Sequence, residues 1–287
     1  MGLSINQNIA AVNSYRNLSN TQNDLSKSLE KLSSGFRINR AADDAAGLAI
    51  SEGLRSQVGG LKVAARNAQD GISVVQTAEG ALTEVHAILQ RVRDLAVQGA
   101  NDSNNMAART NIKTESDSLI AELGRIAQST NFNGTKLLDG SAASLSFQVG
   151  ADGSANSAIS VNLTSANVTT VATALGYNSG TGAVNATAFD VSSHGAAQTT
   201  IGTVDTQISA VSTARANLGA MQNRFEHTIK NINVAGENLS ASESRIRDTD
   251  MASEMVSFTR AQILSQAGTA MLAQANQIPQ GVLSLLR

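Results

Sequence analysis

The sequence predicts a mainly α-helical fold, with long coiled-coil or helical-bundle rods from both chain ends and a small central β-hairpin region. Apolar residues recur at heptad spacing in the first half of the chain and again in its last third. Alternation with a period of two is confined to a segment between them. Aromatic residues make up only 3% of the 287 residues. The core must therefore consist of small and branched aliphatic side chains, which suits helices packed closely side by side.

The first predicted helix is marked by a seam of apolar residues near the N-terminus. The seam consists of Leu18, Leu25, Leu29, Leu32 and Phe36. These positions recur every three, four or seven residues, which is the spacing of one helix face. Ser-Ser-Gly at 33–35 predicts the end of the helix, since Gly35 can adopt the left-handed conformation that closes a helix.

The stretch FRINRAADDAAGLAIS at 36–51 places Asp43 and Asp44 after Arg37 and Arg40. Paired acids beside positive charge are compatible with acid/base chemistry or with the start of a helix. No His or metal-binding partner accompanies them, so we interpret them as a helix cap that accepts backbone N–H bonds. The arginines are expected to screen the acids or to pair with acids of a neighbouring copy.

A long second helix and a shorter third one are predicted next. The second runs over residues 45–98, which would span roughly 80 Å at 1.5 Å per residue. Its apolar positions are Leu54, Val58, Leu61, Ala65, Ala68, Ile72, Val75, Ala78, Leu82, Val85, Leu89, Val92 and Ala96. The polar run at 98–105 ends it, and the third helix is marked by Ile112, Leu119, Leu123 and Ile126. Asn-Phe-Asn-Gly at 131–134 then predicts a turn.

The middle of the chain has a different character. Residues 140–200 contain no Lys or Arg. Apolar and polar residues alternate over 145–149 and over 159–163, with a Gly/Asp/Asn segment between them, which predicts a β-hairpin. Residues 176–199 are predicted to form a short variable surface loop.

Helical spacing returns after the loop and continues to the C-terminus. Seven apolar residues lie seven apart: Val204, Val211, Leu218, Phe225, Ile232, Leu239 and Ile246. The final helix carries Leu264, Met271, Ala275, Ile278, Val282 and Leu285. We expect the N-terminal and C-terminal helices to pair. Being short of internal partners, they are expected to order fully on assembly with other copies.

Composition excludes several classes of function. The chain has 21 basic and 23 acidic residues, without the basic excess that a nucleic-acid surface needs. It has no cysteine and no apolar run near the ~18 residues that span a membrane. HExxH, P-loop and GxSxG motifs are absent, and His86, His194 and His227 lie far apart. We therefore expect no enzyme activity, no cofactor, no metal, no nucleic acid and no membrane insertion.

Several motifs closely resemble bacterial flagellin, in the order in which that family carries them. They are SLEKLSSGFRINRAADDAAGLAIS, QRVRDLAVQ, TNFNGTKLL, FQVGADG and the ending MLAQANQIPQGVLSLLR. The resemblance covers about residues 1–175 and 200–287. Only the short segment between them departs, so the chain resembles a short flagellin with a minimal variable region.

The resemblance implies a structural subunit that self-assembles into the bacterial flagellar filament used for swimming motility. Residues 1–43 with 247–287 would form a terminal coiled coil in the filament's inner core. Residues 44–175 with 200–246 would form an outer tube of helical rods and the hairpin. In this interpretation the coiled-coil contacts are Leu18, Leu25, Leu29, Leu32, Leu264, Met271, Ile278, Val282 and Leu285.

The family also implies a location and a set of partners. The protein would be secreted through the flagellum's own type III export apparatus and reside in the extracellular filament. The N-terminal sequence lacks the basic and continuous apolar segments of a secretory leader, so export without a cleaved leader is expected. Expected partners are other copies of the chain, an export chaperone at the C-terminal helix, and the filament cap and hook-junction proteins.

The stretch QRVRDLAVQ at 90–98 has two interpretations. As a helix face, it would turn Val92 and Ala96 inward and its arginines outward. In many flagellins the same stretch contacts the flagellin-sensing Toll-like receptor of animal hosts, and in the filament it lies between subunits. The positions that this resemblance implies for an inter-subunit or receptor surface are Gln90, Arg91, Leu95, Gln98 and Glu115.

Two alternatives remain open from the sequence. A hook–filament junction or cap protein shares terminal helices with flagellin, although the ending QIPQGVLSLLR and the small insert favour the main subunit. Some flagellins host a protease in the variable region, but this chain has no HExxH and only 24 residues there.

Overall fold

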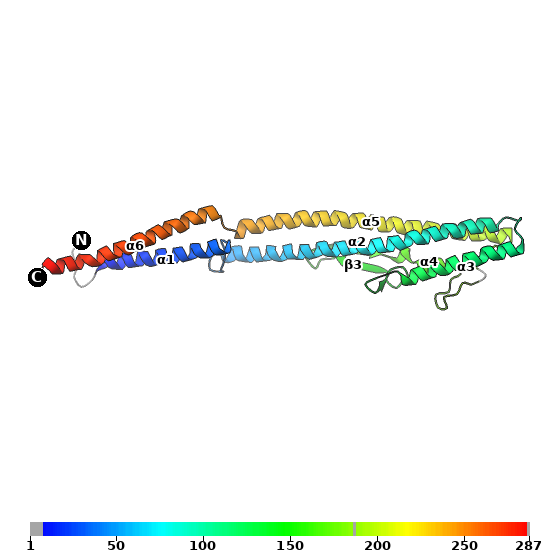
Figure 1. The fold of residues 1–287 in the computed structure, drawn as a ribbon, viewed down its shortest axis with the longest axis horizontal. Coiled ribbons are helices and arrows are strands. Elements are labelled where there is room, and N and C mark those ends of the chain that lie inside the picture. The colour runs from blue at the N-terminus through cyan, green and yellow to red at the C-terminus, as the bar shows by residue number, and fades with distance from the viewer. Residues whose placement is uncertain (1–7, 186–187, 286–287) are drawn as a thin grey trace. The chain divides into compact units, whose positions relative to one another are not determined.

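The computed structural model describes residues 8–185 and 188–285, with side chains described as far as Gln277. Long helices dominate the described chain, in agreement with the predicted fold class (Figure 1). The chain divides into two compact units. We call residues 1–57 with 237–287 the terminal unit, and residues 58–236 the central unit. No helix among the described residues is long and apolar enough to cross a membrane.

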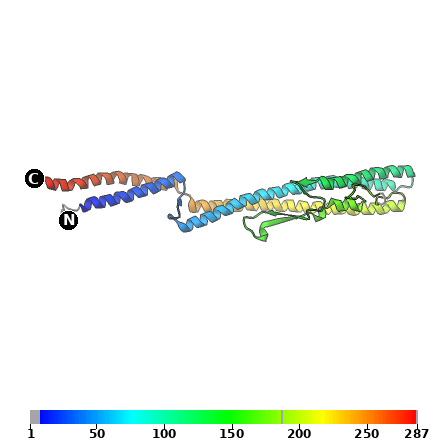
Figure 2. The same ribbon diagram turned by 90° about the horizontal axis from the view of Figure 1, so that it is seen from below.

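The terminal unit is built on two antiparallel helices, α1 (Ile9–Ser34) and α6 (Met251–Leu285), which run alongside each other (Figures 1 and 2). Asn8 caps the start of α1, because its side-chain oxygen accepts the backbone N–H of Ala11. Gly35 ends the helix at φ 76°, the left-handed conformation that the sequence predicts, and donates its N–H to the Lys31 carbonyl. Phe36 therefore lies beyond α1 and is not part of its seam.

The central unit is built on α2 (Ala45–Gly99), α3 (Met106–Ser129) and α5 (His194–Arg247), whose parts within 58–236 pack around one apolar core (Figures 1 and 2). The inward face of α2 carries the predicted heptad positions, and from Ala68 to Ala96 these are almost completely buried. The heptad positions of α5 are buried from Val204 to Ile232. The apolar periodicity thus correctly identifies the faces that form the core.

Two small antiparallel hairpins complete the central unit. The predicted hairpin pairs β3 (Ser144–Gln148) with β4 (Ala158–Asn162). The predicted turn lies between β1 (Asn131–Phe132) and β2 (Thr135–Lys136), where Asn133 and Gly134 take positive φ values of 48° and 82°. Asn-Gly is the preferred pair for such a tight hairpin turn. A short helix, α4 (Val168–Ala174), follows and packs against α3.

The β3–β4 hairpin docks on α2 and α5 through a few close contacts. Phe147 of β3 meets Phe225 of α5 edge to face, with ring centroids 5.6 Å apart. Gly71 of α2 lies under the Phe225 ring, where a Cβ atom would come within 2.7 Å of it. The Asn67 side chain donates to the Gln148 carbonyl at 3.0 Å. A glycine in α2 therefore makes room for the aromatic pair that holds the hairpin.

Residues 176–199 differ from the surface loop that the sequence predicts. α5 already begins at His194, six residues inside that range. Tyr177, Phe189 and Val191 are buried in the core of the central unit. The segment is therefore anchored at both ends, because its apolar residues fill space beside α2 and α3.

Candidate assembly surfaces

The seam between α1 and α6 is built mostly from small residues. On α1 the residues turned away from solvent are Ala11, Ser14, Leu18, Thr21, Leu25, Ser28 and Leu32. On α6 they are Glu254, Phe258, Ala261, Ser265, Gly268, Leu272 and Ala275. Both sets alternate steps of three and four, as a coiled-coil seam does. A Cβ on Gly268 would lie 3.2 Å from a Leu18 methyl, so the helices approach closely there.

Polar contacts at the two ends of the seam fix its register. The Asn8 side chain donates to the Ala275 carbonyl at 2.8 Å, while Lys31 and Glu254 approach to 3.7 Å. Both groups of the Lys31–Glu254 pair remain partly exposed, so this ion pair contributes little stability. Together with the Leu18–Gly268 contact, these contacts place each α1 residue opposite a defined α6 residue.

The predicted coiled-coil residues divide between this seam and the surface. Leu18, Leu25 and Leu32 lie on the seam and are half-buried. Leu29 is 51% exposed, and on α6 Leu264 and Met271 are 52% and 63% exposed. For contact within the chain, the prediction for these three residues is wrong, because α6 presents its small residues to α1 instead. Ile278, Val282 and Leu285 lie outside the residues whose side chains are described.

Hydrogen bonds join the segment between α1 and α2 to the segment between α5 and α6. Arg37 donates its backbone N–H to the Arg247 carbonyl at 2.7 Å, and Thr249 donates to the Gly35 carbonyl at 3.0 Å. The Arg247 guanidinium lies 4.7 Å from the centroid of the Phe36 ring and donates to Glu52 at 2.8 Å. These backbone and side-chain contacts hold the two connecting segments of the terminal unit together.

Asp43 and Asp44 have separate structural roles at this junction. Asp44 accepts the Gly47 N–H at 2.8 Å and so caps α2. Asp43 accepts the backbone N–H groups of Arg40 and Asn39, and these bonds lower the pKa of its carboxyl group. The cap interpretation thus fits the geometry of Asp44, while Asp43 closes the turn that precedes the helix.

The side chains of the two arginines near these acids bind other groups of the same chain. The side chain of Arg40 pairs with Glu30 of α1 at 2.8 Å. Arg37 donates to the Ile246 carbonyl at 2.8 Å. Within the chain, both arginines therefore tie the junction to the helices on either side of it.

The 90–98 stretch lies on α2, and most of its predicted contact residues are exposed. Gln90, Arg91 and Gln98 face solvent, as does Glu115 on α3. Arg91 binds Glu115 through two nitrogens, at 2.9 and 2.6 Å. Leu95 is only 1% exposed and belongs to the core. Its assignment to a contact surface is therefore wrong, because it sits on the inward face of the helix together with Val92.

Sequence reasoning did not identify an ion pair that joins α2 to α5. Arg93 donates to Asp205 at 2.5 Å, and this hydrogen bond raises the pKa of the guanidinium. The two residues lie 112 positions apart. Only the antiparallel pairing of the two helices brings them together, so a local sequence pattern could not have indicated the contact.

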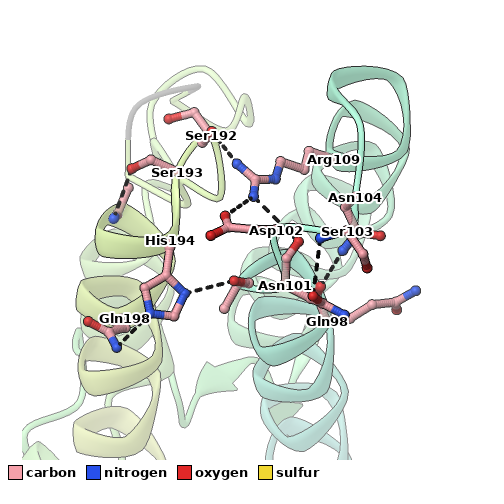
Figure 3. A network of polar contacts seen from close by, with 12 residues as sticks. Gln98, Asn101, Asp102, Ser103, Asn104, Arg109, Ser192, Ser193, His194 and Gln198 are labelled. Atoms are coloured by element: carbon pink, nitrogen blue, oxygen red, sulfur yellow. Dashed lines mark hydrogen bonds and ion pairs between the residues drawn. The ribbon is translucent and has the colours of Figure 1, made fainter.

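A second polar network closes the end of the central unit where α2 turns into α3 (Figure 3). Arg109 of α3 donates to the Ser192 carbonyl at 2.5 Å and pairs with Asp102 at 3.0 Å. A ring nitrogen of His194 lies 2.8 Å from the Ala100 carbonyl oxygen. These contacts attach the start of α5 to the α2–α3 turn.

The described residues contain no group of three or more His, Asp or Glu side chains placed to hold a metal ion. The polar clusters of the two units are instead engaged in caps, turns and helix-to-helix ties. The helices present extended surfaces, and some of these surfaces are apolar and exposed to solvent.

Comparison with known proteins agrees with these features. Residues 5–143 match the family model of the bacterial flagellin N-terminal helical region, and residues 201–286 match that of the C-terminal helical region. The chain is 52% identical to a flagellin of Halalkalibacterium halodurans and 50% identical to one of Bacillus subtilis, in each case over 99% of both chains. It is 46% identical to a flagellar filament 33 kDa core protein of Treponema phagedenis, again over 99% of both chains. The chain belongs to the bacterial flagellin family, whose members are structural subunits of the flagellar filament.

Proposed function

We propose that this flagellar filament subunit polymerises through the exposed apolar faces of its terminal unit. The proposal rests on the distribution of exposed large hydrophobic residues between the two units. Among the described residues of the terminal unit they are Ile9, Val12, Tyr15, Leu29, Phe36, Ile50, Met251, Met255, Val256, Ile263, Leu264 and Met271. Among the described residues of the central unit they are Val63, Val97, Met106 and Val234.

The physical argument concerns what stabilises the terminal unit. More than half of the seam residues are Ala, Ser, Thr or Gly, which bury little apolar area. Helices gain most of their stability from packing. Each Å² of apolar surface removed from water stabilises by about 25 cal/mol. Covering the outer faces with other copies would therefore bury the additional apolar area that the seam alone does not provide. Contacts between unlike surfaces that do not close into a ring produce a helical filament.

The same exposed faces support the proposed partners and route. Before assembly, the apolar face of α6 would need a cover, which fits an export chaperone bound at the C-terminal helix. We propose that the mature subunit lies outside the cell and reaches the filament through the flagellar type III apparatus. The filament cap and hook-junction proteins would meet the same terminal helices at the two ends of the polymer.

The exposed part of the 90–98 stretch supports a second, dependent role. Gln90, Arg91, Gln98 and Glu115 form an accessible polar surface on the monomer. We propose that neighbouring subunits cover this surface in the filament and that a host Toll-like receptor senses it on the monomer. Arg91→Ala should then lower receptor signalling in reporter cells. An unchanged dose response would contradict this role.

Removal of residues 278–287 tests the polymerisation proposal most directly. We expect a soluble chain that no longer forms filaments, since α6 loses the segment beyond its partner α1. Electron microscopy measures polymerisation, and heat unfolding followed by circular dichroism checks that the central unit is intact. Normal filaments from the shortened chain would contradict the proposal.

A further inference from the structure

The outer face of α6 carries an open apolar hollow. It has a volume of about 480 Å³ and is lined by Met255, Val256, Thr259, Arg260, Ile263 and Leu264. Its large apolar residues are all half exposed or more. Arg260 has no hydrogen-bond or ion-pair partner within the described part of the chain. The hollow thus offers an apolar floor with the Arg260 guanidinium beside it.

A projecting apolar strip lies on α1, close to its start. Ile9, Val12 and Tyr15 are 65%, 67% and 66% exposed and follow one another at steps of three, so they are neighbours on the helix surface. Tyr15 supplies a large ring with a polar tip. Such a ring buries its face readily in an apolar site and is attracted by a guanidinium placed over it.

The hollow and the strip cannot meet within one chain. Leu18 lies opposite Gly268, and Lys31 lies opposite Glu254. In that register the middle of the hollow is level with residue 26 of α1, eleven residues beyond Tyr15. At 1.5 Å per residue, the two surfaces are offset by roughly 15 Å along the helix pair. The hollow also faces away from the seam.

We infer that Tyr15 of one copy inserts into the Met255–Leu264 hollow of the next copy, shifted by roughly 15 Å along the helices. This inference rests on the proposed function, since it specifies the contact by which terminal units assemble. The occupant is a second copy because the chain itself supplies both complementary surfaces. One is an apolar strip with an aromatic ring, and the other is an apolar hollow lined by an arginine. Each copy fills one hollow and offers another, so the contact is heterologous and open-ended.

Disulfide trapping tests this inference, because the chain contains no cysteine of its own. Two chains, one with Tyr15→Cys and one with Ile263→Cys, are mixed, polymerised and oxidised, and the products are separated without reductant. We expect cross-linked pairs that join one chain of each kind, identified by mass. Gln22→Cys is the matched control, since it lies on the same face of α1 one heptad further on and is exposed. Its distance of roughly 10 Å along the helix from Tyr15 exceeds what a disulfide tolerates.

The possible results separate the inference from the proposed function. Cross-linking of either variant with itself, equal cross-linking of the control, or filaments without mixed pairs would overturn the inference while leaving polymerisation intact. Failure of the unaltered chain to form filaments under the microscope would overturn the proposed function itself. A non-covalent readout is independent of cysteine: Tyr15→Ala should raise the critical concentration for polymerisation several-fold, and Tyr15→Phe should not. Equal effects of the two substitutions would contradict insertion of the ring.

Discussion

The terminal and central units bury their apolar residues in opposite ways. In the central unit, α2, α3, α5 and the hairpins surround a continuous core that includes Leu82, Leu95 and Phe225. In the terminal unit, the buried hydrophobic residues among those described are Ile38, Ala261 and Ala275. Its larger apolar side chains mostly face outward. The difference indicates that the central unit is stable as a folded body, whereas the terminal unit depends on contacts with other copies.

The largest change in the free energy of unfolding is expected when one leucine from each unit is replaced and the two variants are compared. Leu95→Ala should lower the free energy of unfolding of the monomer by about 2–5 kcal/mol, because it leaves a cavity in a fully packed core. Leu264→Ala should change it by less than about 0.5 kcal/mol, because this side chain is half exposed. Denaturant unfolding of the soluble monomer measures both. Similar losses for the two variants would contradict the contrast.

In polymerisation, the Leu264 substitution should have the larger effect of the two, provided that both monomers are folded. At a temperature where both monomers are folded, Leu264→Ala should raise the critical concentration more than Leu95→Ala does. The reason is that Leu264 lines the outer face of α6, whereas Leu95 is covered within its own chain. Sedimentation of filaments against monomer concentration provides this measurement.

A smaller effect distinguishes two glycines of α2 within the central unit. Gly71→Ala should destabilise the monomer by about 1–3 kcal/mol, because the new methyl group would overlap the Phe225 ring. Gly59→Ala meets no atom within 4 Å and should stabilise the helix by about 0.5–1 kcal/mol. Opposite shifts of the melting temperature are expected. Stabilisation by both substitutions would contradict the tight packing of the hairpin against α2.

The smallest effect concerns acid and the junction of the terminal unit. The pKa of Asp43 is lowered by backbone hydrogen bonds from Arg40 and Asn39. Its contribution to stability is therefore present above the ordinary Asp pKa of about 4 and is lost as the pH falls through the lower folded value. Asp43→Asn should make the junction less sensitive to pH below about 4. Hydrogen exchange at the amide groups of Asn39 and Arg40 reports this, and an unchanged pH dependence would contradict it.

The sequence predicted the long helices well because heptad spacing is a local signal. A spacing of seven identifies Val204 to Ile232 as a buried face, and residue type identifies Gly35 as a helix end. Alternation predicts the β3–β4 hairpin, and composition predicts the Asn-Gly turn. Each of these features depends on residues that are close in the chain.

The errors arose where more than one helix face is apolar. α6 carries both small residues and large apolar ones, and the large ones were expected to form the seam with α1. The structure places Ala261, Gly268 and Ala275 there instead, since small residues allow the two backbones to approach closely. Leu95 was wrongly assigned to a surface because a resemblance identifies positions in a stretch but not the direction in which each side chain points.

Short-range spacing and residue type are enough to predict which segments are helical, where they are capped and which family the motifs resemble. Three further features follow from the way the helices pack: which face of α6 meets α1, the pairing of Arg93 with Asp205, and the place of Gly71 beside the aromatic pair that holds the hairpin. Such choices depend on the register between segments more than a hundred residues apart. That register is set by the summed packing of whole helix faces, which no local pattern contains.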